Sequence, residues 1–203
     1  MPPPDEPAIG YPPVPVDGYA VSWESWESWE PWESSERSSS ERCTLRWENE
    51  GWTVEGVVTG VDVHYVVRLS ARWRVQQVLL FRDLPDPDLW LATDGGGRWG
   101  EVGGAHRVEL DGCVDVEIGC TPFTYSLPIR RLPLAVGESA RTEVVTVDVE
   151  TLAVRREQRT YTRNATHRFT IQGTGGWATA VEVDEYGLVI DEPNRFRRVQ
   201  ASP

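Results

Sequence analysis

The chain contains no lysine, so all 20 of its basic residues are arginine. Against them stand 32 acidic residues, and the formal net charge of the 203-residue chain is −12. A surface with this excess of negative charge repels phosphate backbones and anionic lipid head groups. The composition therefore argues against nucleic acid as a partner and against attachment to an acidic membrane surface.

Cysteine and histidine are scarce, with three of each. An odd number of cysteines without C-x-x-C spacing fits neither a disulfide framework nor a zinc ribbon. The histidines are scattered, and neither H-x-H nor H-E-x-x-H spacing occurs. The sequence thus predicts no bound metal and no other cofactor. The residues concerned are Cys43, Cys113, Cys120, His64, His106 and His167.

Catalytic motifs and membrane-directing segments are also missing. There is no G-x-S-x-G elbow to present a nucleophile, so no residue is assigned as catalytic and a non-enzymatic protein is expected. No run approaches the roughly 20 apolar residues that cross a bilayer. The start, "MPPPDEPAIGYPPVPVDG", has prolines and acids where a secretory signal has a basic start and an apolar run. We therefore expect a cytoplasmic protein without a transmembrane segment.

The first 42 residues differ in composition from the rest, with nine acids, two arginines and many prolines and serines. The run "SWESWESWEPWE" places tryptophans three residues apart, at Trp23, Trp26, Trp29 and Trp32. A spacing of three matches neither a helix nor a strand, so these rings form no continuous apolar face. We expect residues 1–42 to be a disordered acidic tail, and residues 43–203 to form one domain.

Strand patterns dominate that domain. Every odd position from Val61 to Val75 is apolar or aromatic, which predicts a hairpin that turns near Ser70 and Ala71 with its odd face inside. Similar alternation returns in "RTEVVTVDVE" and "GWATAVEVDE", and glycine-rich turn signals separate the runs. Strands at this density predict a single all-β barrel, roll or sandwich of a dozen or more strands.

One helix is expected, in "TPFTYSL", because Thr121 can cap a helix whose first residue is Pro122. Pro128 should end it, leaving "PIRRLPL" extended. In an extended segment neighbouring side chains point to opposite faces, so only one of Arg130 and Arg131 should face the interior. Asp115 and Glu117 share one face of the preceding strand and are expected to be solvated; the alternatives are an internal pair with the inward-facing arginine and a catalytic carboxylate.

The block "LDGCVDVEIGCTPFTYSLPIRRLPLAVGES", Leu110 to Ser139, resembles the signature of a family of small bacterial and archaeal proteins called putative glycolipid-binding, or glycolipid-binding-like. The flanks "LRW" at 45–47, "YTR" at 161–163 and "VDEYGLVIDEPNRFRRV" at 183–199 are similar to that family too. Departures from its usual pattern are Tyr125, Ser126, Glu192 and Arg195.

The resemblance implies a spiral β-roll, a many-stranded sheet wrapped around one helix, that tends to form homodimers. It also implies, by analogy with acyl-chain carriers of similar shape, an apolar cavity that holds an amphiphilic lipid or glycolipid. The candidate ligand-binding residues are Asp115, Thr121, Phe123, Tyr125, Arg130 and Arg131. The alternative is a roll filled by its own side chains, acting through a homodimer interface or as an uncharacterised enzyme with a cleft at residues 110–139.

Overall fold

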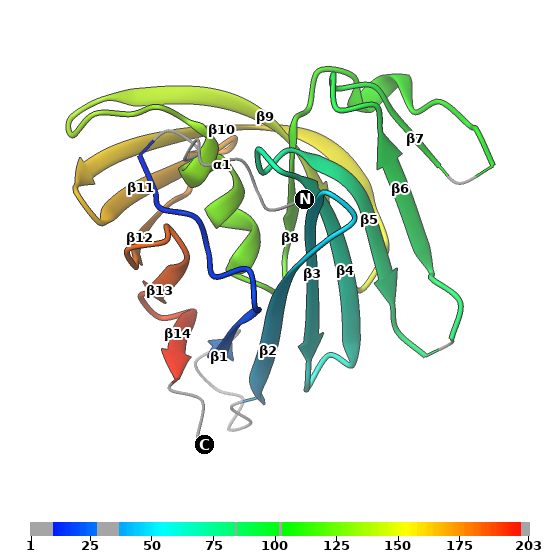
Figure 1. Cartoon of the computed structure of the whole chain (residues 1–203), viewed down its shortest axis with the longest axis horizontal. Coiled ribbons are helices and arrows are strands. Elements are labelled where there is room, and N and C mark those ends of the chain that lie inside the picture. Colours follow the sequence, from blue (N-terminus) through cyan, green and yellow to red (C-terminus); the bar gives the residue numbers. More distant parts are fainter. Residues whose placement is uncertain (1–9, 28–36, 84, 102, 200–203) are drawn as a thin grey trace.

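Within residues 10–27, 37–83, 85–101 and 103–199, which the computed structural model describes, fourteen strands form one sheet (Figure 1). The strand order is β7-β6-β5-β4-β3-β2-β1-β14-β13-β12-β11-β10-β9-β8. Neighbouring strands are antiparallel except β8 and β9, which are parallel. The strands are β1 Tyr19–Glu27, β2 Arg37–Glu48, β3 Gly51–Val58, β4 Val63–Ser70, β5 Val75–Phe81, β6 Leu89–Thr93, β7 Trp99–Glu101, β8 Asp115–Ile118, β9 Ser139–Val147, β10 Val154–Ala165, β11 Arg168–Gly173, β12 Ala178–Val183, β13 Val189–Glu192 and β14 Phe196–Val199.

The sheet curls around the helix α1 (Ser126–Arg131), which Figure 1 shows inside the curve. Its two edge strands, β7 and β8, are joined through the segment that leads into β8. The indole N–H of Trp99 donates to the carbonyl of Cys113 at 2.9 Å, and the N–H of Gly112 donates to the carbonyl of Gly97 at 2.8 Å. The prediction of an all-β roll wrapped around one short helix is confirmed.

The hairpin predicted from the alternation after Val61 is also present. Strand β4 buries its odd positions, including Tyr65 and Leu69, and leaves the even ones partly exposed. The chain turns between Ser70 and Arg74 before β5. Trp73, in this turn, has a positive φ of 59° and is buried against Trp52 and Phe123, with ring centroids 6.1 and 6.4 Å away. Aromatic side chains thus occupy the interior beside the helical segment.

The expectation of a disordered N-terminal tail is wrong for the residues that the structure describes. Strand β1 pairs with β2 on one side and with β14 on the other. Strands β1 and β2 therefore lie in the middle of the sheet. Trp23 is fully buried, and its indole N–H donates to the carbonyl of Val189 at 2.9 Å. The true pattern is the period of two in Tyr19, Val21 and Trp23, which the triplet spacing of the tryptophans obscures.

The predicted domain boundary therefore changes as well. Strand β2 runs through Cys43, the residue at which the domain was expected to begin. Trp29 and Trp32 lie outside the described residues. Since β1 joins β2 to β14, the sheet needs the segment from Tyr19 onward to connect its two halves.

The helical segment begins at Phe123, one residue later than expected, and extends further than expected. The Thr121 hydroxyl oxygen accepts a hydrogen bond from the N–H of Phe123 at 3.1 Å, as a capping side chain does. A 3-10 turn, η2 (Phe123–Tyr125), continues directly into α1. Pro128 did not end the helix because it lies in the first turn of α1, where a missing N–H is tolerated. The chain becomes extended only at Leu132.

Gly56 in β3 lies opposite Tyr65 in β4, and the Tyr65 ring occupies the space that a Cβ atom on residue 56 would take. The substitution Gly56→Ala is therefore expected to lower the free energy of unfolding by about 1–3 kcal/mol. Val57→Ala, at the half-exposed neighbouring position, should change it by no more than about 0.5 kcal/mol. Urea unfolding compares the two variants, and equal midpoints would mean that Tyr65 moves aside without cost.

Candidate functional site

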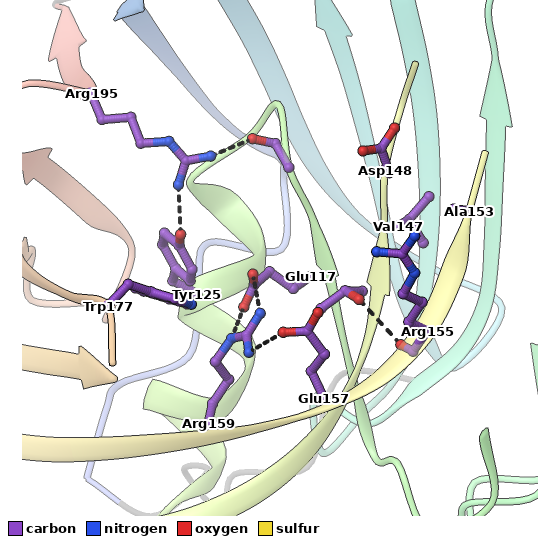
Figure 2. A pocket seen from close by; sticks show the side chains of 12 residues that line it. Glu117, Tyr125, Val147, Asp148, Ala153, Arg155, Glu157, Arg159, Trp177 and Arg195 are labelled. Carbon is purple, nitrogen blue, oxygen red and sulfur yellow. Dashed lines mark hydrogen bonds and ion pairs between the residues drawn. The ribbon is translucent and has the colours of Figure 1, made fainter. Parts of the chain in front are cut away.

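A pocket of about 370 Å³ opens beside the helical segment, between the ends of β8, β9 and β10 and the chain entering β12 (Figure 2). Most of its lining is charged or polar. The lining residues are Glu117, Gly119, Tyr125, Thr146, Val147, Asp148, Ala153, Arg155, Glu157, Arg159, Trp177 and Arg195. This pocket differs from the expected apolar cavity, since only a minority of these side chains are hydrocarbon.

Arg159 lies at the centre of the pocket wall and is held by two carboxylates. Its Nε and Nη2 donate to the two oxygens of Glu117 at 2.8 and 2.9 Å, and its Nη1 donates to Glu157 at 2.7 Å. Burial lowers the pKa of Arg159, but the hydrogen bonds and charges of Glu117 and Glu157 outweigh it and raise the pKa above its ordinary value. The guanidinium is thus a fixed cation with a fixed orientation.

Trp177 forms the aromatic part of the wall. The Arg159 guanidinium lies 4.9 Å from the centre of the indole, a cation–π contact. Gly173, the last residue of β11, lets the Trp177 indole lie directly against its backbone. A Cβ atom at position 173 would overlap the indole ring. The indole is nevertheless 37% exposed. It is therefore an oriented aromatic surface that remains accessible to a ligand.

Arg195 connects the helical segment to the turn between β13 and β14, as Figure 2 shows. Its Nη1 donates to the Tyr125 hydroxyl at 2.8 Å, and its Nη2 donates to the carbonyl of Gly119 at 2.7 Å. Burial raises the pKa of the Tyr125 phenol, so this group is neutral at physiological pH. Arg195 also lies 3.6 Å from Glu192. These contacts fix the floor of the pocket.

The charges of the pocket balance. Three arginines, Arg155, Arg159 and Arg195, face three acids, Glu117, Asp148 and Glu157. Backbone and side-chain hydrogen bonds from Thr151 lower the pKa of Asp148, so that this carboxylate is ionised. A pocket with fixed donors and acceptors and no net formal charge is suited to an uncharged ligand with many hydroxyl groups.

Of the six ligand-binding residues predicted from the sequence, Tyr125 lines this pocket. Phe123 is buried in the larger apolar cluster of the core. The Thr121 hydroxyl donates to buried Glu41 at 2.8 Å. The structure therefore brings Thr121 and Phe123 into internal contacts rather than into the pocket.

Asp115 and Arg131 form a buried ion pair. Arg131 Nε donates to both carboxylate oxygens at 3.2 Å, and its Nη2 donates to Oδ2 as well. The Asp115 side chain is fully buried, whereas 20% of the Arg131 side chain is exposed. Of the alternatives raised for Asp115, the internal pair with an arginine is thus the one that the structure contains.

Arg130 is also directed inward, which contradicts the expectation that only one of the two arginines would be. Both positions are helical, so the alternation of an extended chain does not apply. Arg130 is 1% exposed, and it contacts carbonyl groups and aromatic rings instead of the carboxylate that was expected for a buried guanidinium.

The residues that sequence reasoning missed are Arg155, Glu157, Arg159, Trp177 and Arg195. A signal existed for three of them. Arg155, Glu157 and Arg159 alternate along "RREQR" and therefore lie on one face of β10, which places opposite charges in a row. Trp177 and Arg195 come from distant loops, and no local pattern marks them.

No group of three or more His, Cys, Asp or Glu side chains that could hold a metal ion occurs in the described part of the chain. Nor does any helix in that part have the length and apolar character needed to span a membrane.

Comparison with known proteins gives two matches. A family model described as "Putative glycolipid-binding" matches residues 31–198. The crystal structure of a DUF1089-family protein from Pseudomonas aeruginosa is similar, with a TM-score of 0.65 and 26% sequence identity over 88% of this chain and 92% of that one. No curated protein sequence matches this chain.

Proposed function

Because this chain belongs to the family described as "Putative glycolipid-binding", we propose that it is a binding protein that holds the sugar head of a glycolipid in the pocket beside α1. The observation that carries the proposal is the oriented, 37% exposed indole of Trp177 next to the Arg159–Glu117–Glu157 network. The apolar C–H face of a sugar ring packs on an aromatic face. Its hydroxyls can then donate to the carboxylates and accept from the guanidiniums.

The size and charge of the pocket support a neutral head group rather than a whole lipid. At about 370 Å³ the pocket lies near the lower end of the roughly 300–1,000 Å³ range of small-molecule sites. One or two sugar rings fit this space, whereas sugar and acyl chains together do not. In this proposal the hydrocarbon chains extend out of the pocket, and the lining charges, which cancel, favour uncharged sugars over phosphorylated ones.

The proposal predicts that Trp177→Ala weakens the binding of alkyl glycosides at least tenfold, the loss of roughly 1.4 kcal/mol expected for an aromatic surface of this kind. Isothermal titration with a panel of octyl glycosides below their micelle concentrations measures this. Octyl tetraethylene glycol ether, a neutral amphiphile without a sugar, is the ligand control.

Trp90→Ala is the matched protein control, since Trp90 in β6 is also 37% exposed but does not line the pocket. It should bind the glycosides as the natural chain does. The proposal fails if the natural chain binds the ether as tightly as the glycosides, if it binds no glycoside in the panel, or if both tryptophan variants behave alike.

A further inference from the structure

A buried arginine without a carboxylate partner lies on the side of α1 that faces the N-terminal segment. Arg130 is 1% exposed, and its guanidinium donates to backbone carbonyls rather than to carboxylates. Its Nη1 donates to the carbonyl of Tyr186 and its Nη2 to that of Pro12 at 3.2 Å. The guanidinium also lies 3.9 Å from the centre of a Trp73 ring. Its Nε has no acceptor within the described part of the chain.

A second arginine contacts the Tyr11 ring that Arg130 contacts. The guanidiniums of Arg130 and Arg163 are each 5.9 Å from the centre of the Tyr11 ring. Arg163 donates to the carbonyls of Leu134 and Thr166, both at 2.9 Å, and no carboxylate pairs with it among the residues described. Two cations thus share one aromatic ring in a largely buried place.

Several polar atoms there have no hydrogen-bond partner in the described structure. They are the Nε atoms of both arginines and the hydroxyls of Tyr11 and Ser126, the latter one helical turn before Arg130. Tyr11 is 4% exposed and Ser126 is fully buried. Buried donors without acceptors are rare in proteins, and a bound ion or water is one of their regular explanations.

The acid whose charge acts on Arg130 is Asp184, and it is already engaged. Its carboxylate accepts from Arg198 at 2.6 Å and from the N–H groups of Tyr186 and Leu188 at 2.8 and 2.9 Å. Burial lowers the pKa of Arg130 to about 10, so the group stays cationic at neutral pH. The positive charge is therefore only partly compensated, by carbonyl dipoles and aromatic faces.

Residues 10–18, which we call the N-terminal strap, cover this place and run alongside α1 in Figure 1. Pro12, Pro13 and Pro15 lack N–H groups, and the backbone bond from Gly18 to Pro15 lies within the strap itself. The side chains of Tyr11 and Val14 anchor it. The other side is closed, since a Cβ atom on Gly187 would come within 3.1 Å of both Arg130 and Tyr11.

We propose that Arg130 and Arg163 form a binding site for an anionic oxygen group, a carboxylate or a phosphate, and that the N-terminal strap is its displaceable cover. The anion takes the place of the Pro12 carbonyl on Arg130 and accepts from the unpartnered Nε–H groups and the Tyr11 hydroxyl. This site is separate from the sugar pocket, and the inference does not rest on the proposed function.

The test uses the full chain in three media of equal ionic strength: sodium chloride, inorganic phosphate, and decanoate below its micelle concentration. A ligand that binds only the folded state raises the melting temperature. We expect a higher melting temperature than in chloride in at least one of the other media. A rise in melting temperature with decanoate alone identifies an anionic amphiphile as the ligand. A rise with phosphate identifies a free inorganic anion as the ligand.

Variants make the test specific. Arg163→Gln should abolish the anion-dependent rise, while Arg168→Gln, a 70% exposed arginine in β11, should keep it. Val14→Ala weakens the cover, so it should lower the melting temperature in chloride and tighten anion binding about tenfold, because the open form is more populated. The proposal is overturned if neither anion stabilises the chain beyond chloride, if the two arginine variants respond alike, or if Val14→Ala leaves the affinity unchanged.

Discussion

Replacing Arg131 with methionine is expected to lower the free energy of unfolding by about 3–5 kcal/mol, the cost of leaving a buried charge without its partner. The Asp115 side chain is fully buried, and Arg131 supplies the cation that it contacts. Burial raises the pKa of Asp115 even with this partner present. Without it, Thr142, whose hydroxyl lies 3.4 Å from Oδ2, is the donor that remains. Urea unfolding at pH 7 measures the difference.

Two further variants separate the lost charge from the lost side chain. The double variant Asp115→Asn/Arg131→Met buries no charge at this place. It should therefore recover more than half of the free energy of unfolding that Arg131→Met loses. Arg168→Met breaks the exposed pair with Glu182, 3.7 Å apart, and should cost less than about 1 kcal/mol. If Arg131→Met costs no more than Arg168→Met, the buried pair does not hold α1 on β8.

The strands that could be predicted were those with an uninterrupted local period. Every odd position from Val63 to Leu69 is apolar or aromatic, and in β4 these positions are the buried ones. Strand β1 carries the same signal over only Tyr19, Val21 and Trp23, and Trp23 is already the first tryptophan of the Ser-Trp-Glu repeat. Its place in the sheet depends on pairing with β14, some of whose residues lie more than 170 positions later in the chain, such as Val199 opposite Ser22. No local pattern contains that information.

The site was harder to predict than the fold for a related reason. The sequence identified Asp115 and Arg131 as possible partners, but which acid meets which arginine depends on the rotation of α1 about its axis. Pro128 suggested that the following residues are extended, and in an extended chain adjacent arginines face opposite ways. Because these residues are helical instead, that argument does not apply to Arg130 and Arg131. The pocket itself needs Trp177 and Arg195, which only the curling of the sheet brings to Tyr125. Residues far apart in sequence are joined by topology, not by spacing.

Substituting Glu41 with glutamine is expected to stabilise the protein by about 3 kcal/mol at pH 8.5, and to change its stability little at pH 4.5. Glu41 is 4% exposed, and no cation pairs with it among the described residues. Its Oε1 accepts from the hydroxyls of Tyr65 and Thr121, while its Oε2 has no partner in the described structure. Glutamine keeps the accepting oxygen and places an uncharged amide where the unpartnered oxygen lies.

The pH dependence follows from the direction of the pKa shift of Glu41. Burial raises the pKa to about 7, against the effect of the hydrogen bonds from Tyr65 and Thr121, while the unfolded chain has the ordinary value of 4.5. Between these values the folded state binds more protons, so its stability falls as pH rises. The contribution is fully present below pH 4.5 and is lost as pH passes through about 7.

Other shifted acids, such as Asp115 and Glu192, titrate in both chains and cancel in the comparison. Urea unfolding from pH 4.5 to 8.5 measures the difference in free energy of unfolding between the natural chain and Glu41→Gln. If this difference does not widen as pH rises, Glu41 is already ionised in the folded protein at pH 4.5.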